Sequence, residues 1–257
     1  MQIAGRKALV IGAARSGIAS ARFLAQRGAT VALNDRKALS EWSPEALALK
    51  AEGIGLIEGD APSWLLDQVD LVVVSPGVPT KSIPIRYADR RGAEVIGEVE
   101  LASRFLKGRI VAITGTNGKT TTTSLIGEML RDAGMNVQVG GNIGTALISL
   151  AESSRDDGWS VVEVSSFQLE TIVDFHPAVA AVLNVTPNHM DRYELLTDYA
   201  AAKNQDDFAG IVGKSFQRFR RRVHARGFRI IHKTYAVNFG DFFQSMFDRF
   251  ELANRLA

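Results

Sequence analysis

Residues 114–121, TGTNGKTT, combine residue types that could bind phosphate. Small residues let backbone N–H groups converge on phosphate oxygens, a lysine meets the β and γ charges, and the following hydroxyl holds Mg²⁺. Gly118, Lys119 and Thr120 supply these features. The loop does not match the strict G-x-x-x-x-G-K-[ST] motif, because the first glycine of that motif would fall at Ile113. A shorter subclass of phosphate-binding loop is therefore indicated. The predicted phosphate-binding residues are Gly115, Thr116, Asn117, Gly118, Lys119, Thr120 and Thr121.

Three later polar clusters each follow an apolar run: GGNIG at 140–144, Glu163 with the SSFQ after it, and NVTPNHMD at 184–191. The carboxyl ends of parallel strands meet at one edge of a sheet, so these groups are expected beside the phosphate loop. Glu163 is a candidate Mg²⁺ ligand, because a buried carboxylate needs a partner or a metal; the alternative is a helix cap. His189 is a candidate functional residue or an ordinary hydrogen-bonded histidine.

An earlier loop, GAARSG at 12–17, also follows an apolar run, and Asp35 lies 23 residues after its first glycine. This is the context of a dinucleotide fingerprint, but Ala14 replaces the middle glycine and would keep a pyrophosphate at a distance. The loop is therefore a phosphate site of another kind or a tight turn without a ligand. Asp35 and Arg36 could contact a ribose or phosphates or belong to a solvated loop. The SPGVP segment at 75–79 follows an expected strand. It either lies at the carboxyl edge of the sheet, where ligands bind, or forms an ordinary turn.

Strands and helices alternate along the first 205 residues, which predicts an α/β fold with parallel sheets. A helix over 98–107 is expected to separate a first domain at 1–97 from a second strand–loop–helix unit that starts at Ile110. The expected strands are Ala8–Ile11, Val31–Leu33, Leu71–Val74, Glu94–Ile96, Ile110–Ile113, Val137–Val139, Val161–Val164 and Val179–Val185.

Composition excludes several classes of protein. The 257 residues include no cysteine, which rules out a disulfide scaffold and a thiolate metal site. No apolar run reaches the ~18 residues of a membrane helix, and the N-terminus does not resemble a signal peptide. We therefore expect a cytoplasmic protein without membrane or nucleic-acid partners. The net charge of +2 hides a contrast, since residues 206–257 carry ten basic and five acidic side chains and nine of the 13 phenylalanines.

The motifs TGTNGKTT, GGNIG, VEVSSFQLE, NVTPNHMDRY and a helix ending in YAAAK occur in this order, and together they resemble the Mur ligase family. DLVVVSPGVP and the Rossmann-like first part agree, and the resemblance covers about residues 5–205. It implies a Rossmann-like UDP-sugar-binding domain at 1–97 and a truncated P-loop parallel-sheet domain, the partial central ATP-binding domain, at 98–205. Residues 206–257 form an atypical tail.

The resemblance also implies an activity and its cofactors, ATP and Mg²⁺. SSFQLE and NHMDRY favour the member that joins D-glutamate to UDP-N-acetylmuramoyl-L-alanine through an acyl phosphate in peptidoglycan synthesis. The catalytic residues would be Lys119, Glu163, His189 and Lys203. Thr120 and Glu163 would bind one Mg²⁺, and His189 and a carbamylated Lys203 a second. By residue type alone, Lys203 is a surface lysine near a helix C-terminus. The implied substrate-binding residues are Arg15, Ser16, Asp35, Arg36, Ser75, Gly77, Asn142 and His189.

The sequence is compatible with several alternatives. The tail could be a frameshifted or mispredicted end, a genuine module in which 216–229 binds RNA or an anionic surface, or an extension without a role. The chain as a whole would be a monomeric, truncated and impaired ligase. A non-catalytic nucleotide- or UDP-sugar-binding fragment is the rival. A dehydrogenase is disfavoured by Ala14 and by the second phosphate loop.

Overall fold

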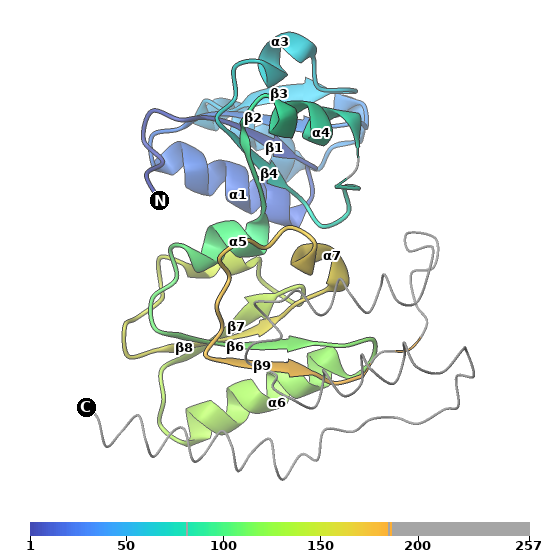
Figure 1. The fold of residues 1–257 in the computed structure, drawn as a ribbon. Coiled ribbons are helices and arrows are strands. Elements are labelled where there is room, and N and C mark those ends of the chain that lie inside the picture. The colour runs from blue at the N-terminus through green and yellow to red at the C-terminus, as the bar shows by residue number, and fades with distance from the viewer. Residues whose placement is uncertain (81, 185, 187–257) are drawn as a thin grey trace.

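The computed structural model describes residues 1–80, 82–184 and 186 of the chain. These residues form two stacked domains, each built on a parallel sheet (Figure 1). The first sheet has the order β3-β2-β1-β4-β5, and all of its described pairings are parallel. Its strands are β1 (Lys7–Ile11), β2 (Thr30–Asp35), β3 (Gly55–Glu58), β4 (Leu71–Val74) and β5 (Glu94–Gly97). The connecting helices are α1 (Arg15–Gln26), η1 (Leu39–Glu41), α2 (Pro44–Ala48), η2 (Leu49–Glu52), α3 (Ser63–Leu66) and α4 (Ile83–Arg90).

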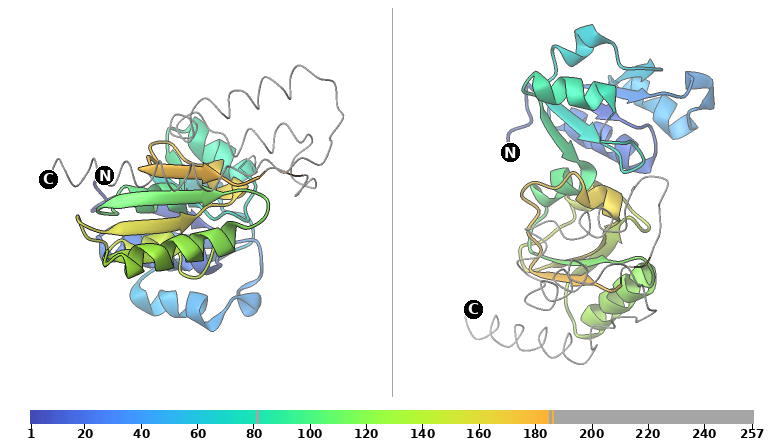
Figure 2. Two further views of the ribbon diagram at one scale, coloured as in Figure 1. Left: turned by 90° about the horizontal axis from the view of Figure 1, so that it is seen from below. Right: turned by 45° about the vertical axis from the view of Figure 1, so that its right-hand side comes forward.

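The second sheet has the order β7-β8-β6-β9 and is also parallel throughout its described pairings. Its strands are β6 (Arg109–Thr114), β7 (Val137–Gly141), β8 (Trp159–Glu163) and β9 (Val179–Val182). The helices of this part are α5 (Glu98–Ser103), α6 (Lys119–Asp132), η3 (Leu147–Leu150) and α7 (Ser166–Leu169). Figure 2 shows α6 running along one face of this sheet. The predicted α/β class is confirmed.

Side-chain alternation explains why both faces of the first sheet are covered. In β1, Ala8 and Val10 point into a core with α1, whereas Leu9 and Ile11 point into a second core with α4. The first of these cores does not stop at the domain boundary. It continues through α5 to Leu147 of η3 and on to β8, so the two domains share apolar contacts. In Figure 1, α5 lies at this junction.

The structure departs from the expected elements at one missed strand and at several boundaries. Strand β3 was not expected, because its residues are only exposed or half-buried and its run GLIE contains a single β-branched side chain. The helix expected to reach residue 107 ends at Ser103, and Gly108 beyond it adopts a positive φ of 75°. The last strand, expected to reach residue 185, ends at Val182, because Asn184 turns to hydrogen-bond with the phosphate loop.

Candidate nucleotide and metal site

The phosphate loop lies between the end of β6 and the start of α6. Gly118 adopts a left-handed conformation, with a φ of 82°, directly before the first helical residue. This conformation is costly for other residue types, so glycine is required there. Lys119 begins α6, and its Nζ donates hydrogen bonds to the carbonyl oxygens of Gly115 and Thr116, both at 2.9 Å. The ammonium group therefore lies over the loop, where it would meet phosphate charge.

Asn184, which follows β9, holds the phosphate loop from the neighbouring strand. Its Oδ1 accepts hydrogen bonds from the backbone N–H groups of Thr116 at 3.1 Å and Asn117 at 2.8 Å. Its Nδ2 donates to the Asn117 carbonyl at 2.9 Å. The sequence pattern put this asparagine in a polar cluster but did not mark it as a site residue. Its position directly after an apolar run was the available signal.

Glu163 ends β8, next to the phosphate loop, because Glu163 pairs in register with Ile113 of β6. Its side chain is almost wholly buried. Oε2 accepts a hydrogen bond from Thr120 Oγ1 at 2.8 Å, and Oε1 accepts one from Asn142 Nδ2 at 2.7 Å. The alternative of a helix cap is wrong, since Ser165 caps α7 instead.

The donor atoms at this point suit Mg²⁺. A buried carboxylate oxygen and a threonine hydroxyl lie side by side at the start of α6. Both are the hard oxygen ligands that Mg²⁺ takes together with phosphates. Within the described residues there is no group of three or more histidine, cysteine or acidic side chains that could enclose a metal. His189 and Lys203, predicted for a second Mg²⁺, lie outside the described residues.

Two of the predicted substrate residues brace the first glycine-rich loop. Asp35 accepts hydrogen bonds from the backbone N–H groups of Ala13 at 2.8 Å and Lys37 at 3.0 Å. The buried hydroxyl of Ser75 donates to the Gly12 carbonyl at 3.1 Å. A side chain at Gly17 would place Cβ 1.8 Å from that same carbonyl oxygen. The loop is thus a closely packed strand–helix turn.

The other predicted substrate residues are more accessible. Arg36 is exposed and forms a 3.4 Å ion pair with Asp60, while Ser16 is half-buried at the start of α1 and Gly77 is exposed. Arg15 is also exposed, and its Nη2 donates to the Asn142 carbonyl at 3.0 Å. This contact joins the first loop to the second domain. The structure thus connects Arg15, Asn142, Glu163 and Thr120.

Glu98, at the start of α5, is a buried acid that sequence analysis did not identify. Its Oε1 accepts a hydrogen bond from the Ile148 N–H at 2.7 Å, and its Oε2 has no partner among the described residues. Burial raises the pKa of Glu98 to about 7, although backbone hydrogen bonds from Ile148 and Leu147 and the charge of Arg15 oppose the shift. A glutamate directly after a strand end was the only signal.

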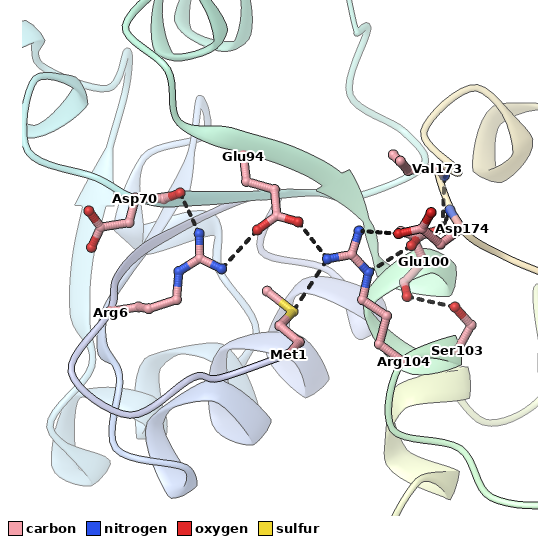
Figure 3. Close-up of polar contacts among 9 residues, drawn as sticks. All are labelled: Met1, Arg6, Asp70, Glu94, Glu100, Ser103, Arg104, Val173 and Asp174. Atoms are coloured by element: carbon pink, nitrogen blue, oxygen red, sulfur yellow. Dashed lines mark hydrogen bonds and ion pairs between the residues drawn. The ribbon is translucent and has the colours of Figure 1, made fainter.

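A second cluster of charges joins the two domains away from the phosphate loop (Figure 3). Arg104 bridges Glu94 of β5, the fully buried Glu100 of α5 and Asp174. Burial alone would raise the pKa of Glu94, but hydrogen bonds from Arg104 and Arg6 outweigh it and hold that pKa below its usual value. An open hollow of about 550 Å³ borders this cluster. Its charges are paired with one another, so the cluster is structural.

No helix among the described residues is long and apolar enough to cross a membrane.

A solved UDP-N-acetylmuramate:L-alanyl-gamma-D-glutamyl-meso-diaminopimelate ligase from Neisseria meningitides shares this fold, with a TM-score of 0.50 at 18% identity. The alignment covers 77% of this chain and 66% of that chain.

Curated relatives are more similar in sequence. The UDP-N-acetylmuramoylalanine--D-glutamate ligase of Acidobacterium capsulatum is 49% identical over 205 residues, which are 80% of this chain and 44% of the relative. That of Solibacter usitatus is 51% identical over 206 residues, 80% of this chain and 45% of the relative. The chain thus spans less than half the length of these relatives.

Two family models match successive parts of the chain. The Mur ligase MurD-like N-terminal domain matches residues 6–97, and the Mur ligase middle domain matches residues 113–205. The first match covers the sheet from β1 to β5, and the second begins at Ile113 within β6 and covers β7, β8 and β9. The chain therefore belongs to the Mur ligase family, of which it carries the MurD-like N-terminal domain and the middle domain.

Proposed function

We propose that this chain is part of an ATP-dependent ligase that joins D-glutamate to UDP-N-acetylmuramoyl-L-alanine in peptidoglycan synthesis. The observation that carries the proposal is the contact between Thr120 and the buried Glu163, next to Lys119 at the phosphate loop. The substrates are proposed from the names of relatives about 50% identical, which are D-glutamate ligases of UDP-N-acetylmuramoylalanine. The proposed domains are residues 1–97 for the UDP-sugar and 98–205 for ATP, and an atypical tail follows at 206–257 in the sequence.

The residue types suit phosphoryl transfer, which depends on positioning and charge neutralisation. The γ-phosphoryl group of ATP passes to a carboxylate oxygen of the UDP-sugar, and ADP leaves. The amine of D-glutamate then attacks the acyl carbon, an amide bond forms, and phosphate leaves. Lys119 would neutralise phosphate charge, and Thr120 and Glu163 would hold one Mg²⁺, which neutralises developing charge when bound. His189 and Lys203 would hold a second ion.

The N-terminal domain would bind the UDP part of the substrate. The braced loop presents Arg15 and Ser16 at the start of α1, where N–H groups and the helix dipole favour phosphate. Asp35 and Ser75 would shape this loop, as their hydrogen bonds to it indicate. Arg36, Gly77, Asn142 and His189 complete the proposed set. We also propose a cytoplasmic monomer.

A second candidate is a nucleotide- or UDP-sugar-binding fragment without catalysis, favoured by the Lys119 contacts at the phosphate loop, which would serve binding with or without a reaction. A phosphate-release assay with ATP, UDP-N-acetylmuramoyl-L-alanine and D-glutamate separates the two. Release that requires all three compounds supports the ligase. Binding of ATP or the UDP-sugar by calorimetry without release supports the fragment. Absence of both binding and release would contradict both candidates.

A further inference from the structure

The side chain of Asn142 contacts the candidate metal ligand directly. Its Nδ2 donates to Oε1 of Glu163 at 2.7 Å, and its backbone N–H donates to the Glu163 carbonyl at 2.8 Å. The other carboxylate oxygen, Oε2, faces the Thr120 hydroxyl. Because the amide engages one oxygen, rotation of the carboxylate is restricted. Oε2 is thereby kept on the side of the phosphate loop.

The segment that carries Asn142 is also held by the N-terminal domain. Arg15 of α1 donates to the Asn142 carbonyl at 3.0 Å across the domain junction. A few residues further on, the N–H of Ile148 donates to the buried Glu98 at 2.7 Å. The position of Asn142 therefore depends on contacts from both domains.

We propose that Asn142 is a positioning residue that orients Glu163 for Mg²⁺, and that Arg15 couples the N-terminal domain to this carboxylate through the Asn142 backbone. The proposal rests on the proposed function, because the ion is the one that accompanies ATP. Hydrogen bonds from outside the ligand shell commonly orient metal ligands and set metal affinity. A neutral amide is suited to this role, since it leaves the carboxylate charge available to the cation.

The test measures binding of a fluorescent ATP analogue to the full 257-residue chain, in EDTA and at rising Mg²⁺. Mg²⁺ is expected to enhance binding of the analogue. For Asn142→Ala, we expect the Mg²⁺ concentration that gives half of this enhancement to rise about tenfold or more. Binding in EDTA should stay within about twofold of the unsubstituted chain, as expected for a neutral contact outside the nucleotide site. Arg15→Ala should raise the Mg²⁺ requirement less, about threefold, because it removes one exposed hydrogen bond.

Gln138→Ala is the matched control. Gln138 lies in β7, the strand that directly precedes Asn142, and its amide donates to Ser160 Oγ at 2.9 Å, away from Glu163. The Mg²⁺ concentration for half-maximal enhancement of binding should be the same in Gln138→Ala as in the unsubstituted chain. An unchanged Mg²⁺ requirement in Asn142→Ala overturns the inference and leaves the ATP site standing. An equal loss of binding with and without Mg²⁺, together with a lower Tm, shows a merely structural role and also overturns it. If the unsubstituted chain shows no Mg²⁺-dependent nucleotide binding, the proposed function fails as well.

Discussion

At the scale of single residues, Lys119 has the clearest predicted effect. Its ammonium group contacts two loop carbonyls at 2.9 Å and would exchange these contacts for phosphate oxygens. Charge-assisted hydrogen bonds are worth about 1.5–3 kcal/mol each. We therefore expect Lys119→Ala to weaken ATP binding at least about tenfold and to abolish phosphate release. Titration calorimetry and the release assay measure these effects.

Lys50→Ala is the control for this substitution, because Lys50 is an exposed lysine of η2 in the N-terminal domain. It should bind ATP as the unsubstituted chain does. Unchanged ATP affinity in Lys119→Ala would remove the phosphate-loop assignment.

The buried side chain of Glu98 predicts that the free energy of unfolding of the chain depends on pH. Its pKa rises from 4.5 to about 7 on folding because of burial. Between these values the unfolded chain loses the proton while the folded chain keeps it. The contribution of Glu98 to the free energy of unfolding is therefore full below about pH 4.5, falls as pH rises, and is lost above about pH 7. The fall is on the order of 3 kcal/mol.

Urea unfolding of Glu98→Gln between pH 4.5 and 8 checks this expectation, because glutamine keeps the acceptor for Ile148 but does not titrate. The difference in stability between the variant and the unsubstituted chain should shift in favour of the variant as pH rises. Glu41→Gln, at an exposed position, should show no such trend. A pH-independent difference for Glu98→Gln would contradict the raised pKa.

At the scale of elements, Arg104 connects β5 and α5 with the segment that contains Asp174, 70 positions further along the chain (Figure 3). Its Nε donates to Oε1 of Glu100 at 2.7 Å, and Oε2 of Glu100 accepts from the N–H groups of Val173 and Asp174 at 2.8 and 3.0 Å. Arg104→Met would leave the buried Glu100 without its cation. Removing one partner of a buried pair costs about 3–5 kcal/mol. We expect a loss of that size in urea unfolding.

Arg155→Met is the matched control for this pair. Arg155 and Asp157 form an ion pair at 3.0 Å, but both side chains are more than 60% exposed. Exposed pairs contribute about 0–1 kcal/mol. Equal losses for the two variants would show that the Arg104 cluster does not stabilise the junction.

At the scale of the whole molecule, the shared core predicts that the two domains unfold together. Leu147 of η3 is fully buried in this core, which also contains side chains of α1 and β1. Leu147→Ala should cost about 2–5 kcal/mol. Hydrogen exchange should then accelerate by a similar factor for amides of β1 and of β6. Acceleration confined to β6 would show that the domains unfold independently.

Leu125→Ala provides the comparison, because Leu125 lies on α6 and is 48% exposed. Its effect on exchange in either sheet should be small, since surface substitutions are usually within about 0.5 kcal/mol.

Local pattern was sufficient to predict the α/β class, the strand–loop–helix unit around 114–121 and the place of Glu163 at a strand end. Each of these depends on residues that are near one another in sequence, such as a buried run followed by glycine and lysine. Strand β3 was missed because a short, half-buried strand gives only a weak periodic signal in the sequence.

Only the tertiary structure determined which of the strand ends meet. The order β7-β8-β6-β9 brings Asn142, Glu163 and the phosphate loop together, and no periodicity specifies that order. Arg15 reaches Asn142 across 127 positions of sequence, and Asn184 reaches Asn117 across 67. The sequence alone therefore determined which groups could perform the chemistry. Strand pairing and the shared core determined which of them touch, because long-range contacts depend on packing of the whole chain.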